Sequence, residues 1–339
     1  MKIFNQHVND LEIRKIVGID SFNNSILDGW KYRKSTTVNR ASGAINDYQM
    51  KLLVGESSGA SGEEVDCGGK CLSNFNDLRF TKLDGKTLLP YFIESVTGTT
   101  PNQLATVWIK FDEILTSATR IYMYYGNSGA SSYSNGTNTF IKFDDFERGN
   151  DGDPLGSAWT TGGTAVISTS QAFRGTRSLK LAGINGATSS TARLLGVTRG
   201  DNLYAIQLRV FQKTGIVQTN YYHGNGTKLI NAMTTNIGGV WYYDTGAVNT
   251  GSSISMDQWQ LMEFKNINFT SSTYDIFANG LSAKDNAGMM TNSGTINLFT
   301  ITSYNPALGA DVFIDNVIVR NWRTVEPVWS GTWSGEEIL

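Results

Sequence analysis

Apolar and polar residues alternate in short runs along most of the chain. From Tyr204 to Val210 every second residue is large and apolar, and Ala205, Gln207 and Arg209 stand between them. A period of two places successive side chains on opposite faces of a β-strand, and it is typical of an antiparallel strand buried on one side. No segment has a helical period of useful length. The pattern therefore predicts an all-β protein.

Turn signals separate these runs. Asn279 and Gly280 form a dipeptide that favours a type I′ hairpin turn, because both residues tolerate a positive φ. Several β-branched and aromatic runs at short spacing, bounded by Gly, Asn and Asp, predict antiparallel β-sandwiches. The expected strands lie within residues 30–38, 48–55, 78–96, 105–114, 120–127, 168–183, 202–212, 240–246, 258–269, 274–283, 295–305 and 311–322.

The length of the chain predicts two domains. It has 339 residues, whereas one domain usually takes roughly 100–200. Residues 126–139 are rich in Gly, Ser and Asn and mark the expected boundary. One β-sandwich is expected over residues 29–142 and a second over residues 143–323. The apolar pattern of residues 1–28 is too short for this segment to fold alone. It predicts an N-terminal arm, which is either a disordered terminus or an interaction segment.

Charge and composition narrow the possible partners. Only 17% of the residues are charged, the formal net charge is −2, and no Lys and Arg cluster could neutralise a run of phosphates, so nucleic acid is not expected. No apolar run is long enough to span a membrane, and the first 20 residues lack the apolar core of a signal peptide. The polar, Lys-poor composition is nevertheless typical of an outward-facing protein. Assembly into a virion is the favoured route to the exterior.

The two cysteines, Cys67 and Cys71, stand in the sequence DCGGKC. The pair Gly68-Gly69 would let the loop fold back and bring the two Cα atoms within disulfide distance. A small disulfide ring is expected in an oxidising environment, and two free thiols are the alternative. A zinc site is not expected, because the chain has only two histidines and neither has matching spacing.

The first half of the chain resembles a widespread β-sandwich domain of uncharacterised function found in bacterial, archaeal and viral surface proteins. The resemblance runs from Gly29 to Glu147 and is carried by GWKYRKSTTV, DYQMKLLVG, ATVWIKFDEI and IYMYYGN. The second half is similar to a concanavalin-like, laminin-G-like jelly roll through FDDFERG, FRGTRSLKL, YDIFANG and DVFIDNVIVRNW. The ending VEPVWSGTWSGEE resembles the terminus of the first family. The resemblance implies that residues 324–339 complete the first sandwich and that the jelly roll is an insertion.

The acidic residues of the jelly roll predict a structural calcium ion rather than catalysis. Retaining glucanases of this fold resemble one another in a strand with the pattern E-x-D-x-x-E, which this chain lacks. In many jelly-roll carbohydrate-binding modules an opening acidic strand and an Asp of the closing strand hold calcium. By resemblance the matching positions are Asp145, Glu147 and Asp315, whose hard oxygens suit Ca²⁺. The alternative is that these acids cap turns and accept backbone N–H bonds.

Two aromatic segments are candidates for ligand binding. They contain Tyr221, Tyr222 and His223 in NYYHGNG, and Trp241 and Tyr243 in VWYYDTG. A sugar ring has an apolar C–H face that stacks on Trp or Tyr, while Asn, Asp and His bind its hydroxyls. The alternative is that these aromatic residues belong to the core of the sandwich.

These observations predict a non-enzymatic structural protein of a virion or cell surface, such as a capsid decoration, a tail protein or a fibre-associated subunit. Its arm would dock on other virion or surface proteins or on further copies of the chain, and its jelly roll would attach to glycans or a host surface. A stand-alone carbohydrate-binding surface protein is the alternative. A glycoside hydrolase is the third and least favoured hypothesis.

Overall fold

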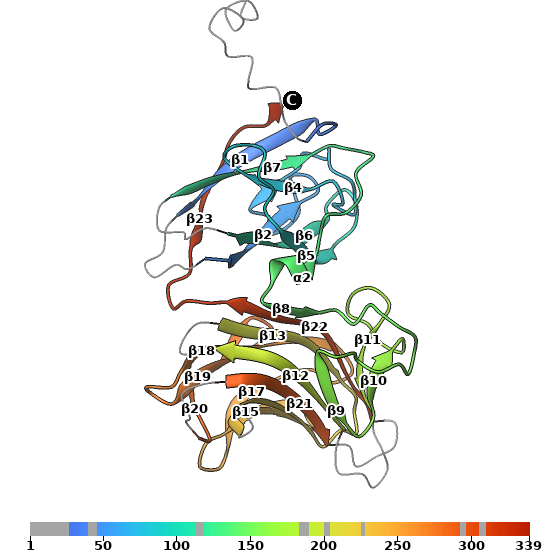
Figure 1. The fold of residues 1–339 in the computed structure, drawn as a ribbon, viewed down its shortest axis with the longest axis vertical. Helices are drawn as coiled ribbons and strands as arrows, with labels where there is room; N and C mark the ends of the chain where they lie inside the picture. Colours follow the sequence, from blue (N-terminus) through green and yellow to red (C-terminus); the bar gives the residue numbers. More distant parts are fainter. Residues whose placement is uncertain are drawn as a thin grey trace, which may run out of the picture.

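The structure is a computed structural model that describes residues 27–39, 46–112, 118–182, 190–199, 204–224, 228–291, 296–304 and 310–339. The predicted arm therefore lies almost entirely outside the described residues. The described chain consists of β-strands and one short helix, α2 (Gly136–Thr139). Its strands form four sheets in two sandwiches that lie end to end (Figure 1). This arrangement confirms the prediction of an all-β fold. Within the described ranges no helix is long and apolar enough to cross a membrane.

The first sandwich contains β1 (Tyr32–Asn39), β2 (Tyr48–Gly55), β3 (Val65–Asp66), β4 (Arg79–Lys82), β5 (Tyr91–Thr97), β6 (Leu104–Phe111), β7 (Thr119–Tyr125), β23 (Val328–Trp333) and β24 (Glu337–Ile338). One sheet has the order β23-β1-β7-β4, with β24 also paired to β1, and the other has the order β3-β2-β6-β5. Alternation in β6 turns Val107, Ile109 and Phe111 into the core between these sheets. Trp108 consequently faces the other way, toward the second domain.

The second sandwich contains β8 (Lys142–Asp144), β9 (Trp159–Gly162), β10 (Ala165–Ser168), β11 (Ser178–Leu181), β12 (Ser190–Arg199), β13 (Tyr204–Gln212), β14 (Gln218–Gly224), β15 (Lys228–Thr235), β16 (Gly239–Tyr243), β17 (Ala247–Ser253), β18 (Trp259–Asn268), β19 (Thr273–Ala278), β20 (Leu281–Gly288), β21 (Ile296–Tyr304) and β22 (Val312–Asn321). The proximal sheet, β10-β11-β22-β13-β18-β19-β20 with β8 paired to β22, lies beside the first domain. The distal sheet, β17-β16-β15-β14-β21-β12-β9, lies on the far side (Figure 1). Together they form the second antiparallel β-sandwich, which is called the jelly roll below.

Local sequence explains these elements well. Tyr204, Ile206, Leu208 and Val210 of β13 all point into the jelly-roll core, as their period of two predicts. Between β19 and β20, Asn279 has a φ of 51° and Gly280 a φ of 78°, so both central residues of the hairpin have the positive φ that a type I′ turn requires.

The two sandwiches meet around a small apolar cluster. Phe92 and Trp108 of the first domain pack against Phe140, Phe143 and Ile318. The ring centroids of Phe92 and Phe143 are 4.6 Å apart in an edge-on arrangement. Four of these side chains are buried and Phe143 is partly buried, so the cluster removes apolar surface from water and holds the domains together.

A buried ion pair lies next to this cluster. The Glu94 carboxylate, which is 4% exposed, accepts hydrogen bonds from Trp108 Nε1 at 2.7 Å and from Arg209 Nη2 at 2.8 Å. Glu94 belongs to β5 of the first sandwich and Arg209 to β13 of the second. The pair therefore fixes the position of one domain against the other.

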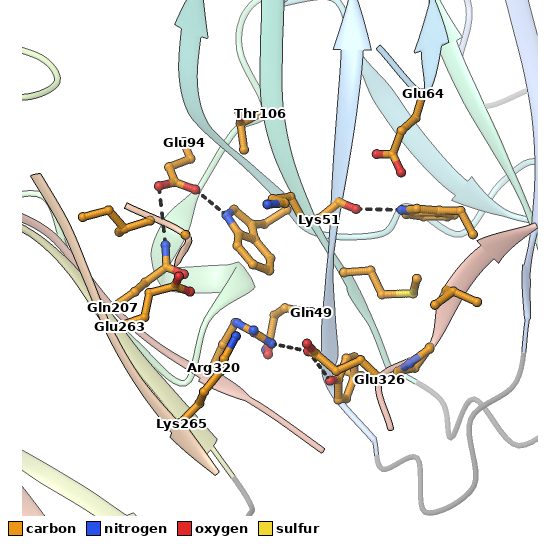
Figure 2. Close-up of a pocket in the computed structure, with 18 of the residues that line it drawn as sticks. Gln49, Lys51, Glu64, Glu94, Thr106, Gln207, Glu263, Lys265, Arg320 and Glu326 are labelled. Atoms are coloured by element: carbon orange, nitrogen blue, oxygen red, sulfur yellow. Dashed lines mark hydrogen bonds and ion pairs between the residues drawn. The ribbon is translucent and has the colours of Figure 1, made fainter. Parts of the chain in front are cut away.

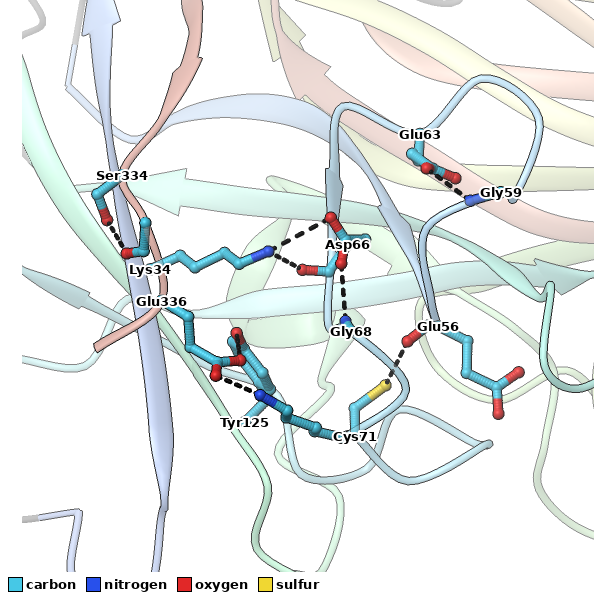
Figure 3. A network of polar contacts seen from close by, with 12 residues as sticks. Lys34, Glu56, Gly59, Glu63, Asp66, Gly68, Cys71, Tyr125, Ser334 and Glu336 are labelled. Atoms are coloured by element: carbon cyan, nitrogen blue, oxygen red, sulfur yellow. Dashed lines mark hydrogen bonds and ion pairs between the residues drawn. The ribbon is translucent and has the colours of Figure 1, made fainter. Parts of the chain in front are cut away.

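The C-terminal segment returns to the first domain. Strands β23 and β24 both pair with β1, so the chain closes the first sandwich only after it has completed the jelly roll. Figure 3 shows the contacts that tie this segment down. The Ser35 N–H donates to Ser334 Oγ at 2.9 Å, the Tyr125 hydroxyl donates to Glu336 Oε2 at 2.7 Å, and Lys70 forms an ion pair with Glu336. In topology the jelly roll is thus an insertion.

We expect Arg209→Met to lower the free energy of unfolding by about 2 to 4 kcal/mol, because it leaves the Glu94 carboxylate buried without its cation. Urea denaturation followed by tryptophan fluorescence measures the change. The matched control is Arg193→Met, at an exposed arginine of the distal sheet, which should cost no more than about 0.5 kcal/mol. Equal effects of the two substitutions would contradict the structural role of the Glu94–Arg209 pair.

Candidate functional site

The outward face of the distal sheet carries three of the five predicted ligand residues. Alternation along β14 and β16 turns Tyr222, Trp241 and Tyr243 outward, while Tyr221 and Tyr242 point into the core. Trp241 and Tyr243 are half-buried. The side of the jelly roll away from the first domain therefore presents Trp241 and Tyr243 to solvent, whereas Tyr222 on the same face is only 6% exposed.

Strand register aligns these aromatic residues with polar ones. Tyr222 lies opposite Asn231 on one side and Thr300 on the other, and Thr300 lies opposite Arg193. The pairing of β15 with β16 ends at Ala232 and Tyr242, and the same register continued by one residue places Tyr243 level with Asn231. One row across the sheet thus combines aromatic faces with amide, hydroxyl and guanidinium groups.

A second row runs parallel to the first, two residues along each strand. Met233 lies opposite both Trp241 and Asn220, Asn220 lies opposite Thr302, and Thr302 lies opposite Thr191. Neither row contains a carboxylate. These two rows therefore offer hydrogen-bond donors and acceptors beside aromatic rings.

Asn231 has an unused hydrogen-bond acceptor in the first row. Its side chain is 7% exposed, and its Oδ1 atom has no hydrogen-bond partner among the described residues. Buried polar atoms in folded proteins nearly always have a partner, because desolvating them without one is costly. A ligand hydroxyl at this position would supply it.

The structure corrects two of the predicted ligand residues. Tyr221 and His223 point into the jelly-roll core and are fully buried. The His223 ring packs edge-on against Phe264 and Phe299, with centroids 5.1 Å and 4.9 Å away. Burial lowers the pKa of His223 to about 3, and neither ring nitrogen has a partner in the described part of the chain. The alternative interpretation, that these residues belong to the core, holds for both.

Two of the three predicted calcium ligands lie near each other. Asp315, on β22, is fully buried and accepts N–H bonds from Phe173, Arg174 and Asn316 at 2.8, 3.1 and 2.7 Å. Burial raises its pKa to about 7, and the negative charge of Asp145 adds to the rise. Burial likewise raises the pKa of Asp145. A nearby positive charge would stabilise the ionised forms of these two desolvated carboxylates.

Glu147, the third predicted ligand, points elsewhere. Its Oε1 atom accepts N–H bonds from Thr176 and Arg177 at 2.8 and 2.7 Å, the turn-capping role that was the alternative. The reason is local: Phe146 has a φ of 57°, so the strand ends at Asp144 and alternation does not carry Glu147 to the face of Asp145. Across the described residues no three His, Cys, Asp or Glu side chains form a group that could hold a metal.

Two residues beside these acids were not predicted from the sequence. Arg174 is close enough for Asp145 and Asp315 to act on its charge, although burial lowers its pKa. Asn316 has a φ of 46°, is 1% exposed, and its amide oxygen and nitrogen have no partner among the described residues. The Asp315-Asn316 pair in FIDNV was the sequence signal that could have identified Asn316.

Two carboxylates and an amide oxygen without a hydrogen-bond partner are oxygen ligands that suit calcium. Asp145 and Asp315 would hold the ion, and its binding stays a prediction.

Asp144, the first acid of FDDFERG, serves the fold. Its carboxylate accepts hydrogen bonds from Trp159 Nε1 at 2.7 Å and from the Phe146 N–H at 2.8 Å, and it forms an ion pair with Arg148. These bonds anchor the opening strand of the jelly roll to its core. Asp144 is therefore a structural residue.

The two cysteines are neighbours but are free thiols in the structure, so the predicted disulfide ring is not formed in it. The Cys67 side chain is fully buried, and burial together with a hydrogen bond to Cys71 raises its pKa well above the ordinary value. Cys71 Sγ donates to the carbonyl oxygen of Glu56 at 3.9 Å (Figure 3). Two free thiols were the alternative prediction.

Comparison with known proteins identifies one family and several similar folds. Residues 74–162, from the first sandwich into the start of the jelly roll, match a family described as a domain of unknown function, DUF2341. The match confirms the resemblance of the first half to an uncharacterised family. No curated protein matches the chain.

Several solved structures are similar at low sequence identity. A sialidase is 8% identical over 64% of this chain, with a TM-score of 0.43, and the match spans only 21% of the sialidase. The cellulose-induced protein Cip1 is 15% identical over 54% of this chain and 98% of its own, with a TM-score of 0.39. The xylan-binding domain CBM22-1 of Paenibacillus barcinonensis Xyn10C is 14% identical over 55% of this chain and 96% of its own, with a TM-score of 0.30.

We expect EDTA to lower the melting temperature, Tm, because a divalent cation would relieve the repulsion between Asp145 and Asp315. At a calcium concentration 100 times the Kd, binding adds about 2.7 kcal/mol, which corresponds to several degrees in Tm. Asp315→Asn should abolish the difference between calcium and EDTA. Glu147→Gln, the matched control, should retain it. Identical wild-type melting curves in calcium and in EDTA would rule out the ion and leave Arg174 as the positive partner.

We expect His223 to make the protein sensitive to acid. Its folded pKa of about 3 lies below the ordinary value of 6.5, so its contribution is complete above pH 6.5 and is lost as the pH falls toward 3. Between pH 7.5 and 4.5 the wild type should lose about 2 to 3 kcal/mol more unfolding free energy than His223→Leu. Urea denaturation at several pH values measures this, and parallel pH profiles for the two proteins would refute it.

Proposed function

We propose that this protein is a non-enzymatic surface protein whose jelly roll binds glycans on the outward face of the distal sheet. The observation that carries the proposal is the row in which Tyr222 and Tyr243 flank the unpartnered amide oxygen of Asn231. Such a row combines the two kinds of contact that a sugar needs.

The chemistry of a sugar ring suits this face. Its C–H bonds form an apolar surface that packs on an aromatic ring, and Trp241 and Tyr243 offer half-buried rings on one strand. Its hydroxyls donate and accept hydrogen bonds, which Asn231, Thr300 and Arg193 can return from the neighbouring strands. Because the strands are part of a sheet, these groups are held in place before the ligand arrives.

The make-up of the same face supports binding without catalysis. Glycoside hydrolysis usually requires two carboxyl groups on either side of the scissile bond. The two rows of the distal face contain amides, hydroxyls and one guanidinium group but no carboxylate. We therefore assign this face the role of attachment rather than cleavage.

A place on a virion or cell surface is the finer part of the proposal. It rests on the polar composition of the chain and on its predicted arm, which would dock on neighbouring subunits. A stand-alone carbohydrate-binding protein is the alternative, and it would use the same distal face. The two differ in whether the chain assembles, which the mass of the full chain in solution measures.

We expect Trp241→Ala and Tyr243→Ala each to weaken binding to a glycan array by about tenfold or more, because each removes a stacking surface worth roughly 1.4 kcal/mol. Tyr221→Phe is the matched control: it changes a tyrosine that points into the core, and glycan binding should stay at the wild-type level. The proposal fails if both alanine variants bind the array as well as the wild type does.

A further inference from the structure

A groove of about 600 Å³ runs between the two domains. Figure 2 shows Glu263 and Arg320 on strands of the jelly roll at one side, and Lys51 and Glu94 on strands of the first domain at the other. We call this space the interdomain groove. It is separate from the distal sheet, which lies on the opposite side of the jelly roll.

Paired charges set the width of the groove. Arg209 bonds to Glu94 across the domain junction, and Arg320 Nη1 donates to Glu326 Oε1 at 2.7 Å. The Tyr48 hydroxyl also donates to Glu326 Oε1, at 2.6 Å. Because the Arg209–Glu94 and Tyr48–Glu326 contacts join residues far apart in sequence, the walls are held by tertiary contacts and the space between them is preformed.

Unused donors remain in the walls after these pairs have formed. The Nε atoms of Arg209 and Arg320 are buried and have no hydrogen-bond partner in the described ranges, and the Arg320 residue is only 4% exposed. Both arginines line the groove, and Glu263 lies there with them. Two N–H donors and a carboxylate acceptor thus lie on three consecutive strands of the proximal sheet, β22, β13 and β18.

An aromatic side chain completes the lining. The half-buried Trp329 of β23 lines the groove, and its Nε1 atom donates to the Lys51 carbonyl oxygen at 2.6 Å. That bond holds the indole ring in one orientation. A fixed indole ring beside hydrogen-bonding groups is the arrangement that packs on the apolar face of a sugar.

The charge balance of the lining indicates a neutral ligand. The groove is lined by four carboxylate and four cationic side chains, so no sign of charge prevails. A polyanion would meet the carboxylates, whereas hydroxyl groups can accept from the guanidinium groups and donate to Glu263. The geometry points to a second glycan site in the interdomain groove, for an uncharged oligosaccharide. This inference does not rest on glycan binding by the distal sheet.

The test is calorimetric titration of the full chain with cellohexaose, xylohexaose and mannohexaose. We expect at least one of them to bind, and Trp329→Ala and Glu263→Ala each to weaken that binding at least tenfold. Trp333→Ala is the matched control, because Trp333 lies on the same strand and packs beside Trp329 without lining the groove. It should leave the affinity unchanged, and melting curves establish that each variant is folded.

A Trp241→Ala variant separates this site from the distal sheet. Binding that survives Trp241→Ala and is lost in Glu263→Ala supports the groove, whatever the outcome on the distal face. Binding that is lost in Trp241→Ala and survives in both groove variants overturns the inference while it leaves the proposed function intact. If none of the three hexasaccharides binds the wild type, the groove is not a site for neutral glycans.

Discussion

The buried carboxylate of Glu94 is the interaction on which the arrangement of this molecule depends. A charge with almost no exposure to water is tolerated only when it is paired and hydrogen-bonded, and Glu94 meets this requirement by using both domains. Trp108 donates to it from its own sheet and Arg209 from the jelly roll. Separation of the domains would break the bond between Glu94 and Arg209. The apolar cluster around Phe92 then adds the burial that makes the junction favourable.

Strand β22 connects this junction with the rest of the fold. All ten of its residues are buried, because it lies in the middle of the proximal sheet and its outer face meets the first domain. It carries both Asp315 and Arg320. Because both side chains are buried, each lies near a group of opposite charge, Arg174 for Asp315 and Glu326 for Arg320. After β22 the chain passes directly to β23, which closes the first sandwich. Completion of one domain is therefore linked to completion of the other.

The two proposed binding surfaces differ in how the fold builds them. The distal face belongs to one sheet, so strand register alone aligns Tyr222, Asn231 and Tyr243. The interdomain groove exists only when both domains are docked, because Trp329 comes from the C-terminal segment and Glu263 from the jelly roll. If both surfaces bind glycans as proposed, one chain would contact an extended glycan at two points, and the first contact would raise the effective concentration of the second.

The amino-acid sequence by itself determined the fold class, many of the strands and the resemblance of the first half to an uncharacterised family, since period-two alternation and turn dipeptides act over a few residues. It did not predict β12, β14, β15 and β17, which lie outside the expected ranges. It could not determine which face of a strand points inward. Tyr221 and Tyr222 are equivalent in sequence, and only the packing of the two sheets turns Tyr221 into the core and Tyr222 to the opposite face. Nor could alternation predict that the left-handed φ of Phe146 turns Glu147 away from Asp145. Interactions between distant residues, such as the electrostatic effect of Asp145 on Asp315, depend on the pairing of β8 with β22, which only the tertiary structure decided.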